Sequence, residues 1–262
     1  MPPMLPRPHR AAGLILLTAL LSAWPVASVR SQAPPLVVSV AASLSDVMSE
    51  LARRHEQATG QAVRLNVAGS NFIARQIIEG ASADAFVSAD ERQMDAVERV
   101  GRLVPGTRAD LLTNQLVVVG RPGSPLRAGD PATLASSQVR RVALGNPESV
   151  PAGVYARRWL EAAGVWAAVA PKVVPTMSVR AALAAVRAGR VDAAVVYATD
   201  AATETSVPVL FRVDPREAPK IVYPVAVVRG PRQQAAGRFV AYLRSPDAGV
   251  VFTNAGFGLA AR

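Results

Sequence analysis

From Leu36 onward, short apolar runs alternate with longer segments in which apolar residues recur every three or four positions. The short runs are typical of buried strands, and the longer segments are typical of amphipathic helices. Strands are predicted at Leu36–Ala41, Val63–Ala68, Asp84–Ser88, Gln115–Gly120, Val139–Leu144, Lys172–Val174, Ala193–Tyr197 and Ile221–Val228. Helices are predicted from Ser43 to Gly60, from 71 to Gly80, at Asp90–Val100, Ala152–Gly164 and Ser178–Gly189, and twice more after the last strand. This alternation predicts an α/β fold with largely parallel sheets.

The chain is expected to fold into two lobes. A break rich in proline and glycine, Arg121–Pro125, follows one predicted strand, and we place the first crossing between the lobes there. The second crossing is expected near Pro219–Tyr223. Residues 34–116 together with 221–262 are therefore predicted to form the first lobe, and residues 117–220 the second. A chain that is 50% hydrophobic has enough apolar material for two cores.

The first 33 residues have the pattern of a targeting segment. Two basic residues, Arg7 and Arg10, precede an apolar run from Ala11 to Ala23. Such a run suits an export signal and is too short to span a bilayer, although an uncleaved anchor is the alternative. Residues 1–33 are thus predicted to be a signal peptide with an open cleavage site, and the mature protein is expected in the periplasm. No later stretch has 18 consecutive apolar residues.

Charge and cysteine content narrow the possible partners. The formal net charge is +10, but no block of five like charges occurs and basic residues do not alternate with aromatic ones. A nucleic-acid partner is therefore not expected. Cysteine is absent, which excludes disulfides, thiolate metal sites, a cysteine nucleophile and a lipid-modified cysteine.

Five loops share one position, just beyond the carboxyl end of a predicted strand. In open α/β sheets this edge is where ligands bind. Three of the loops lead into helices through Ser43, Ser70 and the segment Pro151-Ala152-Gly153, and a fourth helix begins at Ser178-Val179. The fifth loop follows Tyr197, whose phenol is expected at the same edge. The candidate ligand-binding groups are the hydroxyls of Ser43, Ser70 and Tyr197 and the backbone amides of Ala152 and Val179.

Helix N-termini carry unpaired amide donors and roughly half a positive charge each. Several of them together can hold a dianion without any arginine or lysine. A site made of donors favours a fully deprotonated tetrahedral anion, because phosphate near neutral pH keeps a proton that needs an acceptor. Each serine by itself is more simply a helix N-cap, and a tyrosine that ends a strand is ordinarily a packing residue. The hypothesis rests on the combination.

Several segments resemble the periplasmic molybdate-binding proteins of ATP-driven importers. They are Ala41-Ala-Ser-Leu-Ser-Asp46, Gly69-Ser70 followed by Ala74-Arg-Gln-Ile77, Ala83-Asp-Ala-Phe-Val-Ser-Ala-Asp90, Leu144-Gly-Asn-Pro-Glu-Ser-Val-Pro-Ala-Gly-Val-Tyr-Ala156, Val195-Val-Tyr197 with Asp200, and Ile221-Val-Tyr-Pro224. The resemblance extends from about Val37 to the C-terminus, and Asn146–Tyr155 is its most specific part.

The resemblance implies a two-lobed type II periplasmic-binding-protein fold with the ligand cleft between the lobes. It also implies that Ser43, Ser70, Ala152, Val179 and Tyr197 contact the ligand, the metal oxyanion being touched only through its oxygens. The expected ligand is molybdate and also tungstate, with no further cofactor. The expected partners are the membrane permease and the ATPase of an importer, and the protein is expected to be a monomer.

Two positions depart from the family pattern. The loop after Ser70 usually continues with Gly or Ser and then Thr, whereas Asn71-Phe72 stand here, which puts the local amide geometry in doubt. His55 stands where the family commonly has an aromatic residue. It falls on the apolar stripe of its helix, and we interpret it as a residue at the boundary of the core.

Three other classes of protein are less consistent with the sequence. An enzyme is disfavoured because His55 is the one histidine after the targeting segment, and because Asp84 is expected to start a strand and Asp90 to cap a helix. A transcription regulator would need a helix-turn-helix before the first strand. A ferric-ion binder would need clustered ligands, but the tyrosines are widely spread. The main alternative is a binder of sulfate or another tetrahedral oxyanion in the same scaffold.

Overall fold

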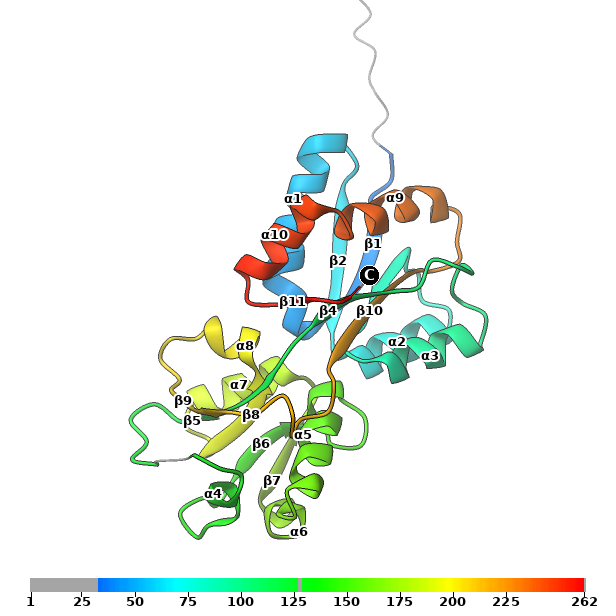
Figure 1. Cartoon of the computed structure of the whole chain (residues 1–262). Coiled ribbons are helices and arrows are strands. Elements are labelled where there is room, and N and C mark those ends of the chain that lie inside the picture. The colour runs from blue at the N-terminus through cyan, green and yellow to red at the C-terminus, as the bar shows by residue number, and fades with distance from the viewer. Residues whose placement is uncertain (1–32, 127–128, 262) are drawn as a thin grey trace, which may run out of the picture. The chain divides into compact units, whose positions relative to one another are not determined.

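Two mixed β-sheets form the frame of the protein in its computed structural model, which describes residues 33–126 and 129–261 (Figure 1). The first sheet has the strand order β11-β4-β10-β3-β1-β2, and the second has the order β7-β6-β8-β5-β9. The predicted signal peptide lies outside the described residues, apart from Ala33. No helix among the described residues is long and apolar enough to cross a membrane.

The strands and helices have the following bounds. The first sheet contains β1 (Leu36–Ala41), β2 (Val63–Ala68), β3 (Ala85–Val87), β4 (Ala109–Thr113), β10 (Val222–Val227) and β11 (Gly258–Leu259). The second contains β5 (Leu116–Gly120), β6 (Val142–Gly145), β7 (Val173–Thr176), β8 (Ala193–Tyr197) and β9 (Val209–Arg212). The helices are α1 (Ser45–Thr59), α2 (Ser70–Ile78), α3 (Glu91–Arg99), α4 (Ala132–Ala135), α5 (Pro151–Ala162), α6 (Trp166–Val169), α7 (Val179–Arg187), α8 (Ala198–Ala202), α9 (Gln233–Leu243) and α10 (Pro246–Asn254). Short 3-10 turns cover Ala42–Leu44 and Ala170–Lys172.

Each sheet combines a parallel group of strands with antiparallel neighbours. In the first sheet β1 pairs in parallel with β2 and β3, while β10 runs antiparallel to β3 and β4. In the second sheet β6 pairs in parallel with β7 and β8, while β5 runs antiparallel to β8 and β9. The sheets are thus mixed, because β10 in the first sheet and β5 in the second run against the parallel group. Below, the first lobe means the first sheet with α1–α3, α9 and α10, and the second lobe means the second sheet with α4–α8.

The chain passes between the two sheets at two places. The first lies at Asn114-Gln115, between β4 and β5, and the second lies between β9 and β10. The break at Arg121–Pro125 follows β5, which already belongs to the second sheet, so the expectation that the chain crosses at this break was wrong. Sequence analysis overlooked β4, a short strand without regular alternation that ends directly before the crossing. The predicted residue bounds of the lobes stay a prediction.

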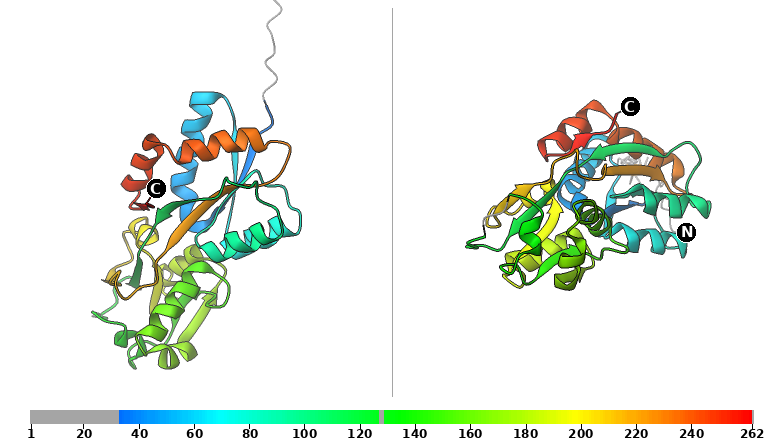
Figure 2. Two further views of the ribbon diagram at one scale, coloured as in Figure 1. Left: turned by 45° about the vertical axis from the view of Figure 1, so that its right-hand side comes forward. Right: turned by 60° about the horizontal axis from the view of Figure 1, so that its bottom comes forward.

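Helices cover both faces of the first sheet. Helices α2 and α3 pack together against β1 and β10, and α1, α9 and α10 lie on the other side (Figures 1 and 2). The alternation along β3 explains the two cores, because Phe86 belongs to the cluster under α2 and α3 whereas Ala85 and Val87 belong to the other cluster. The expected apolar face of α1 is confirmed, since Val47, Met48 and Leu51 are buried.

His55 lies inside the core on the side of the first sheet that α1, α9 and α10 cover. The interpretation of His55 as a residue at the boundary of the core was wrong. Its side chain is buried, with its ring centroid 5.0 Å from that of Phe239 and 5.2 Å from that of Tyr242. Burial, together with the nearby Arg238 charge, lowers the pKa of His55. His55 thus packs among rings as an aromatic side chain would.

The second lobe holds the start of α5 very close to its sheet. A Cβ atom on Gly153 would lie 1.9 Å from the carbonyl oxygen of Gly145, so only glycine allows this approach. Trp159, further along α5, is buried in the core behind it. The first turn of α5 is therefore fixed against the end of β6. This fixes the position of the Ala152 amide as well.

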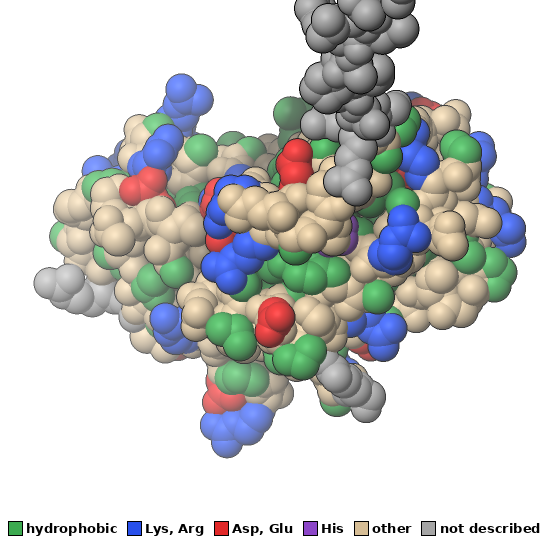
Figure 3. All heavy atoms as spheres, turned by 90° about the horizontal axis from the view of Figure 1, so that it is seen from above, with side chains coloured by type: hydrophobic (Ala, Val, Ile, Leu, Met, Phe, Trp, Pro, Cys, Tyr) green, Lys and Arg blue, Asp and Glu red, His purple; other side chains and the backbone are tan. Residues whose placement is uncertain are grey.

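Charged side chains are dispersed over the surface. Figure 3 shows lysine and arginine side chains on one face of the molecule interspersed with acidic and uncharged residues, without a single basic patch. Many arginines form ion pairs with nearby acidic residues, such as Arg53 and Arg54 with Glu50 on α1. The positive net charge thus reflects composition, as expected.

Candidate ligand-binding cavity

All five candidate residues line one small cavity between the two lobes. Ser43 and Ser70 come from the first lobe, while Ala152, Val179 and Tyr197 come from the second. The other lining residues are Ala41, Ala42, Gly69, Ala89, Val150, Pro151 and Ser178. The cavity offers about 10 Å³ to the centre of a water-sized sphere, which is room for one water molecule. The expected convergence of these positions at one place is thus found, and their role as ligand contacts stays a prediction.

The cavity is surrounded by the first turns of helices. The 3-10 turn Ala42–Leu44 starts directly after β1, and α2 starts at Ser70 after β2. Helix α5 has Pro151 at its first position, and α7 begins with Val179 after β7. The first backbone amides of a helix have no carbonyl partner within the helix, so these turns present N–H donors toward the same space.

Neither serine caps its own helix, although capping was the simpler interpretation. No side-chain hydrogen bond caps the turn that contains Ser43, and Gly69 occupies the N-cap position of α2. The Ser43 hydroxyl lies 3.1 Å from the hydroxyl of Tyr223, and the Ser70 hydroxyl accepts a hydrogen bond of 2.9 Å from the backbone N–H of Ala89. Both side chains are buried, so their hydroxyls are held at the cavity by long-range contacts.

Two predicted caps are confirmed elsewhere. The Ser178 hydroxyl accepts a hydrogen bond from the N–H of Ala181 at 3.2 Å, and Asp90 accepts one from Gln93 at 3.0 Å. Ser178 thereby serves its own helix and leaves the Val179 amide to the cavity. The carboxylate of Asp84 instead binds the N–H of Val37 and the guanidinium of Arg232. Both aspartates have structural partners, which agrees with the roles expected for them.

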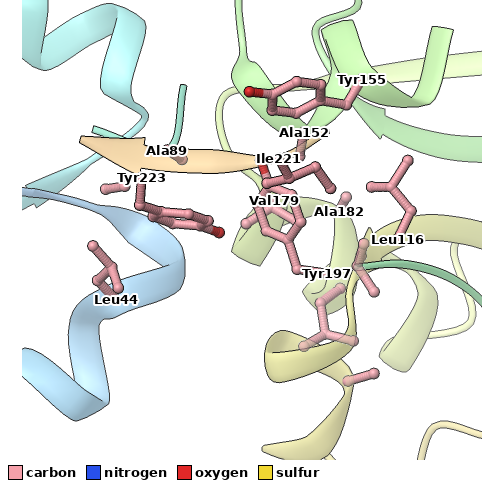
Figure 4. Close-up of a cluster of buried hydrophobic side chains, with 14 of the residues drawn as sticks. Leu44, Ala89, Leu116, Ala152, Tyr155, Val179, Ala182, Tyr197, Ile221 and Tyr223 are labelled. Carbon is pink, nitrogen blue, oxygen red and sulfur yellow. The ribbon is translucent and has the colours of Figure 1, made fainter. Parts of the chain in front are cut away.

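Tyr197 closes β8 with a buried side chain whose hydroxyl has no hydrogen-bond partner among the described residues. Burial, and next the nearby Tyr223 and Tyr155, raise the pKa of Tyr197 well above its ordinary value. The phenol therefore keeps its proton and can donate it. The three tyrosine rings lie in the region where the lobes meet (Figure 4). A buried hydroxyl without a partner costs about 1–3 kcal/mol, and a ligand in the adjoining cavity would remove that cost.

No charged side chain is among the described residues that line the cavity. One network of charges begins next to Val179, at Arg180. Its guanidinium lies 2.7 Å from the carboxylate of Asp46 and 2.5 Å from that of Asp200, the second contact being outside hydrogen-bond geometry. Burial raises the pKa of Asp200 to about 6, and Arg180 limits the rise. The pair with Asp46 also joins α7 of the second lobe to α1 of the first.

Further contacts join the lobes on the other side of the cavity. The side chains of Arg92 and Gln93 on α3 donate to the carbonyl oxygens of Glu148 and Ser149, both at 3.3 Å. Sequence reasoning identified none of these contacts between lobes, because each joins segments far apart in the chain. Asp200 did occur in the segments that carry the family resemblance, but nothing local showed its partner.

A larger cavity of about 670 Å³ adjoins the small one and shares with it Ala42, Gly69, Val150 and Ser178. Its rim carries exposed apolar side chains, Phe72 at 56% and Met177 at 86% exposure. The two residues that depart from the family pattern, Asn71 and Phe72, line this outer cavity and not the inner one. Ser70 remains buried at the inner cavity, so the departure leaves its position intact.

The comparisons with known proteins agree with this arrangement. The family description "Bacterial extracellular solute-binding protein" matches residues 36–258. The chain is 37% identical over 226 residues to the molybdate-binding protein ModA of Escherichia coli (strain K12), covering 85% of this chain and 88% of that protein. The structure resembles the periplasmic molybdate-binding protein of Azotobacter vinelandii with a TM-score of 0.79 at 24% identity, over 86% of this chain and 100% of that one. It also resembles the sulfate-binding protein SubI of Mycobacterium tuberculosis H37Rv, with a TM-score of 0.74 at 18% identity over 86% of each chain.

The chain belongs to the bacterial extracellular solute-binding proteins, a class of binding proteins and not of enzymes. Within that class it is a member of the molybdate-binding protein family. The predicted two-lobed fold, the family and the binding role in place of an enzymatic one are thereby confirmed. No group of three or more His, Cys, Asp or Glu side chains in the described part of the chain is placed to hold a metal ion.

We expect Arg180→Ala to destabilise the protein in a pH-dependent way. A carboxyl whose pKa is raised in the folded state makes folding less favourable as pH rises from its ordinary value of about 4 toward the raised one. Without Arg180 the pKa of Asp200 rises further, so the free energy of unfolding should fall by about 2–3 kcal/mol at pH 7 and clearly less at pH 5. Urea denaturation without added anions measures both values.

Arg187→Ala is the matched control for this prediction. Arg187 lies on the same helix, is exposed, and pairs with Glu204 at 3.0 Å. Removing it should cost under about 1 kcal/mol at either pH, as for other surface pairs. Equal losses at pH 5 and pH 7 in Arg180→Ala would show that the buried carboxylate does not depend on this arginine.

Proposed function

We propose that this protein captures molybdate, and also tungstate, in the inner cavity and delivers it to an ATP-driven membrane importer. The observation that carries the proposal is the composition of the cavity: hydroxyls and helix-start amides from both lobes, with no charged side chain among the described lining residues. Membership of the molybdate-binding protein family supports the choice of anion. The five contacts, Ser43, Ser70, Ala152, Val179 and Tyr197, would bind the oxygens of the anion and leave the metal itself untouched.

The same features support discrimination by protonation state. A dianion that carries no proton can accept hydrogen bonds at every oxygen, which matches a site made of donors. Hydrogen phosphate must place its proton on an acceptor, and a carboxylate suited to that purpose is missing from the described lining. Sulfate carries no proton either and remains the alternative ligand. Its oxygens lie closer to the central atom, so it would leave donors too far away in a frame fitted to a larger anion.

The family membership also supports the expected location and partners. Extracellular solute-binding proteins act outside the cytoplasmic membrane, which agrees with a signal peptide in residues 1–33 and a periplasmic mature protein. We infer that a permease and its ATPase receive the ligand from a monomeric form of this protein. No additional cofactor takes part in the proposal.

Isothermal titration of the purified protein with molybdate, tungstate, sulfate and phosphate tests the proposed ligand. Molybdate and tungstate should bind tightly at one site per chain, sulfate far more weakly, and phosphate without measurable heat. Sulfate binding equal to or tighter than molybdate binding would replace the proposed ligand with the alternative and leave the cavity assignment standing.

Tyr197→Phe separates a ligand contact from a packing role. Because the hydroxyl has no partner among the described residues, its removal should leave the stability of the ligand-free protein unchanged or raise it by about 1 kcal/mol. The same change should weaken molybdate binding by about tenfold, as one hydrogen bond to a charged ligand is lost. Thermal unfolding and calorimetry measure the two effects. A stability loss with unchanged affinity would make Tyr197 a packing residue only.

Binding is expected to close the two lobes on the ligand. The donors are divided between the lobes, and the inner cavity of about 10 Å³ is too small for a tetrahedral anion with four oxygens unless the lobes move apart to admit it. The anion gains all its contacts when the lobes meet again, so it favours the closed form by differential affinity. The passages at Asn114-Gln115 and between β9 and β10 are the expected hinge. The importer is proposed to recognise this closed form.

Small-angle scattering with and without saturating molybdate should show a smaller radius of gyration in the bound state. Gly69→Ala should hinder closure, because a Cβ atom there would lie 2.6 Å from the carbonyl oxygen of Met177 in the other lobe. We expect weaker binding and a larger bound radius in this variant. Gly230→Ala, where no atom lies within 4 Å of the added Cβ, is the matched control. An unchanged radius at saturation in the parent protein would contradict closure.

A further inference from the structure

A chain of buried and partly buried hydrogen bonds starts at Ser43. Tyr223, on β10, is fully buried, and its hydroxyl lies 3.1 Å from the Ser43 hydroxyl. The side-chain amide of Asn114 donates to the same Tyr223 hydroxyl at 3.2 Å and to the Thr199 hydroxyl at 2.9 Å. These contacts run from the cavity into the passage between the sheets.

The partners of Asn114 orient its side-chain amide. Its side-chain oxygen accepts a hydrogen bond of 2.9 Å from the backbone N–H of Gln115, so the amide nitrogen must face the two hydroxyls. Tyr223 therefore accepts a hydrogen bond from Asn114 and has its own proton left for Ser43. Burial, and next the nearby Asp200 charge, raise the pKa of Tyr223 well above its ordinary value, so the phenol keeps that proton.

We propose that Tyr223, held by Asn114, is a positioning residue that makes Ser43 a hydrogen-bond donor toward the bound oxyanion. The Ser43 oxygen accepts the proton of Tyr223, and this leaves the serine's single proton for the cavity. A serine free to rotate could present a lone pair to the anion, which is repulsive. The proposal rests on the proposed function, because it assumes that Ser43 contacts the ligand.

The Ser70 hydroxyl also accepts a hydrogen bond, but its donor is a backbone amide. Its hydroxyl accepts a hydrogen bond from the backbone N–H of Ala89, so its proton is also directed away from that contact. A backbone donor cannot be removed by changing a side chain, whereas the Tyr223 donor can. A change at Tyr223 thus leaves the donor to Ser70 in place.

The chain also connects Ser43 with the second lobe. Asn114 lies where the polypeptide passes from the first sheet to the second, and Thr199 belongs to α8, which begins directly after Tyr197. The rings of Tyr197 and Tyr223 are 5.8 Å apart between centroids. The direction in which Ser43 donates its proton accordingly depends on the relative position of the lobes. It is set when the side-chain amide of Asn114 donates to the hydroxyls of both Tyr223 and Thr199.

A double-mutant cycle tests the proposal. Molybdate affinity is measured by calorimetry for the parent protein, Tyr223→Phe, Ser43→Ala and the double variant. Ser43→Ala should weaken binding by about 10- to 100-fold and Tyr223→Phe by about 3- to 10-fold. In the Ser43→Ala background, Tyr223→Phe should cause no further loss, because the residue through which it acts is gone. Tyr242→Phe, at a half-buried ring remote from the cavity lining, should change nothing.

The outcomes separate the two hypotheses. If Tyr223→Phe weakens binding by the same factor in both backgrounds, it acts independently of Ser43 and the positioning role is wrong. If Ser43→Ala binds molybdate as the parent does, the contact assumed in the proposed function fails instead. Thermal unfolding of each ligand-free variant shows whether it is folded.

Asn114→Asp gives a second route should Tyr223→Phe fail to fold. The carboxylate would accept the Tyr223 proton and take it from Ser43, so affinity should fall. The repulsion between the added charge and the anion persists in the Ser43→Ala background, whereas the loss through Ser43 disappears there. An equal loss in both backgrounds would contradict the proposal.

Discussion

The structure is organised around backbone amides at the starts of helices. These amides have no carbonyl partner within their own helix and therefore need an acceptor from elsewhere. Four such turns follow parallel strands, two in each lobe, and they face one cavity. Buried N–H groups require an acceptor, and here the frame brings them together without supplying one from a charged side chain. The close approach of Gly153 to Gly145 and the backbone bond from Ala89 to Ser70 hold these turns in place. In the proposed function, an anion with several oxygens satisfies them together.

Charged side chains lie behind the lining of the cavity. Arg180, adjacent to the Val179 amide, is paired with the carboxylates of both Asp46 and Asp200, so its positive charge is compensated by these partners and is not left free for the cavity. A bound dianion would thus be stabilised by oriented dipoles and hydroxyls, which keep their geometry better than long flexible side chains do. Selectivity then depends on the distance and direction of donors, and this is where Tyr223 and Asn114 take part. The charges serve mainly to join α7 to α1 and to compensate a buried carboxylate.

Sequence reasoning located most strands and helices, and it placed the five candidate residues at the ends of strands, because both follow from local patterns. Val63–Ala68 and Ala193–Tyr197 have the predicted bounds. What it could not provide were the partners that come from distant segments. Ser43 looked like a cap until its contact with Tyr223, 180 residues away, was known. The pattern of α1 predicted His55 at the boundary of the core. The pattern could not show that Phe239 and Tyr242, which come from a distant segment, pack against its ring. Short edge strands such as β9 were missed because they are partly exposed and have no strong hydrophobic pattern.

The division of donors between two lobes has a consequence for how fast a ligand is released. An anion that is bound by both lobes cannot leave while the lobes are together. Its dissociation rate is therefore limited by how often the lobes separate. The contacts between lobes that lie outside the cavity, Arg180 with Asp46 and Arg92 with Glu148, then govern residence time without touching the ligand. Weakening them would speed dissociation while leaving the encounter rate nearly unchanged, since the association rate depends on diffusion to the open form. Under the proposed function, a protein built in this way would retain its anion until a partner separates the lobes.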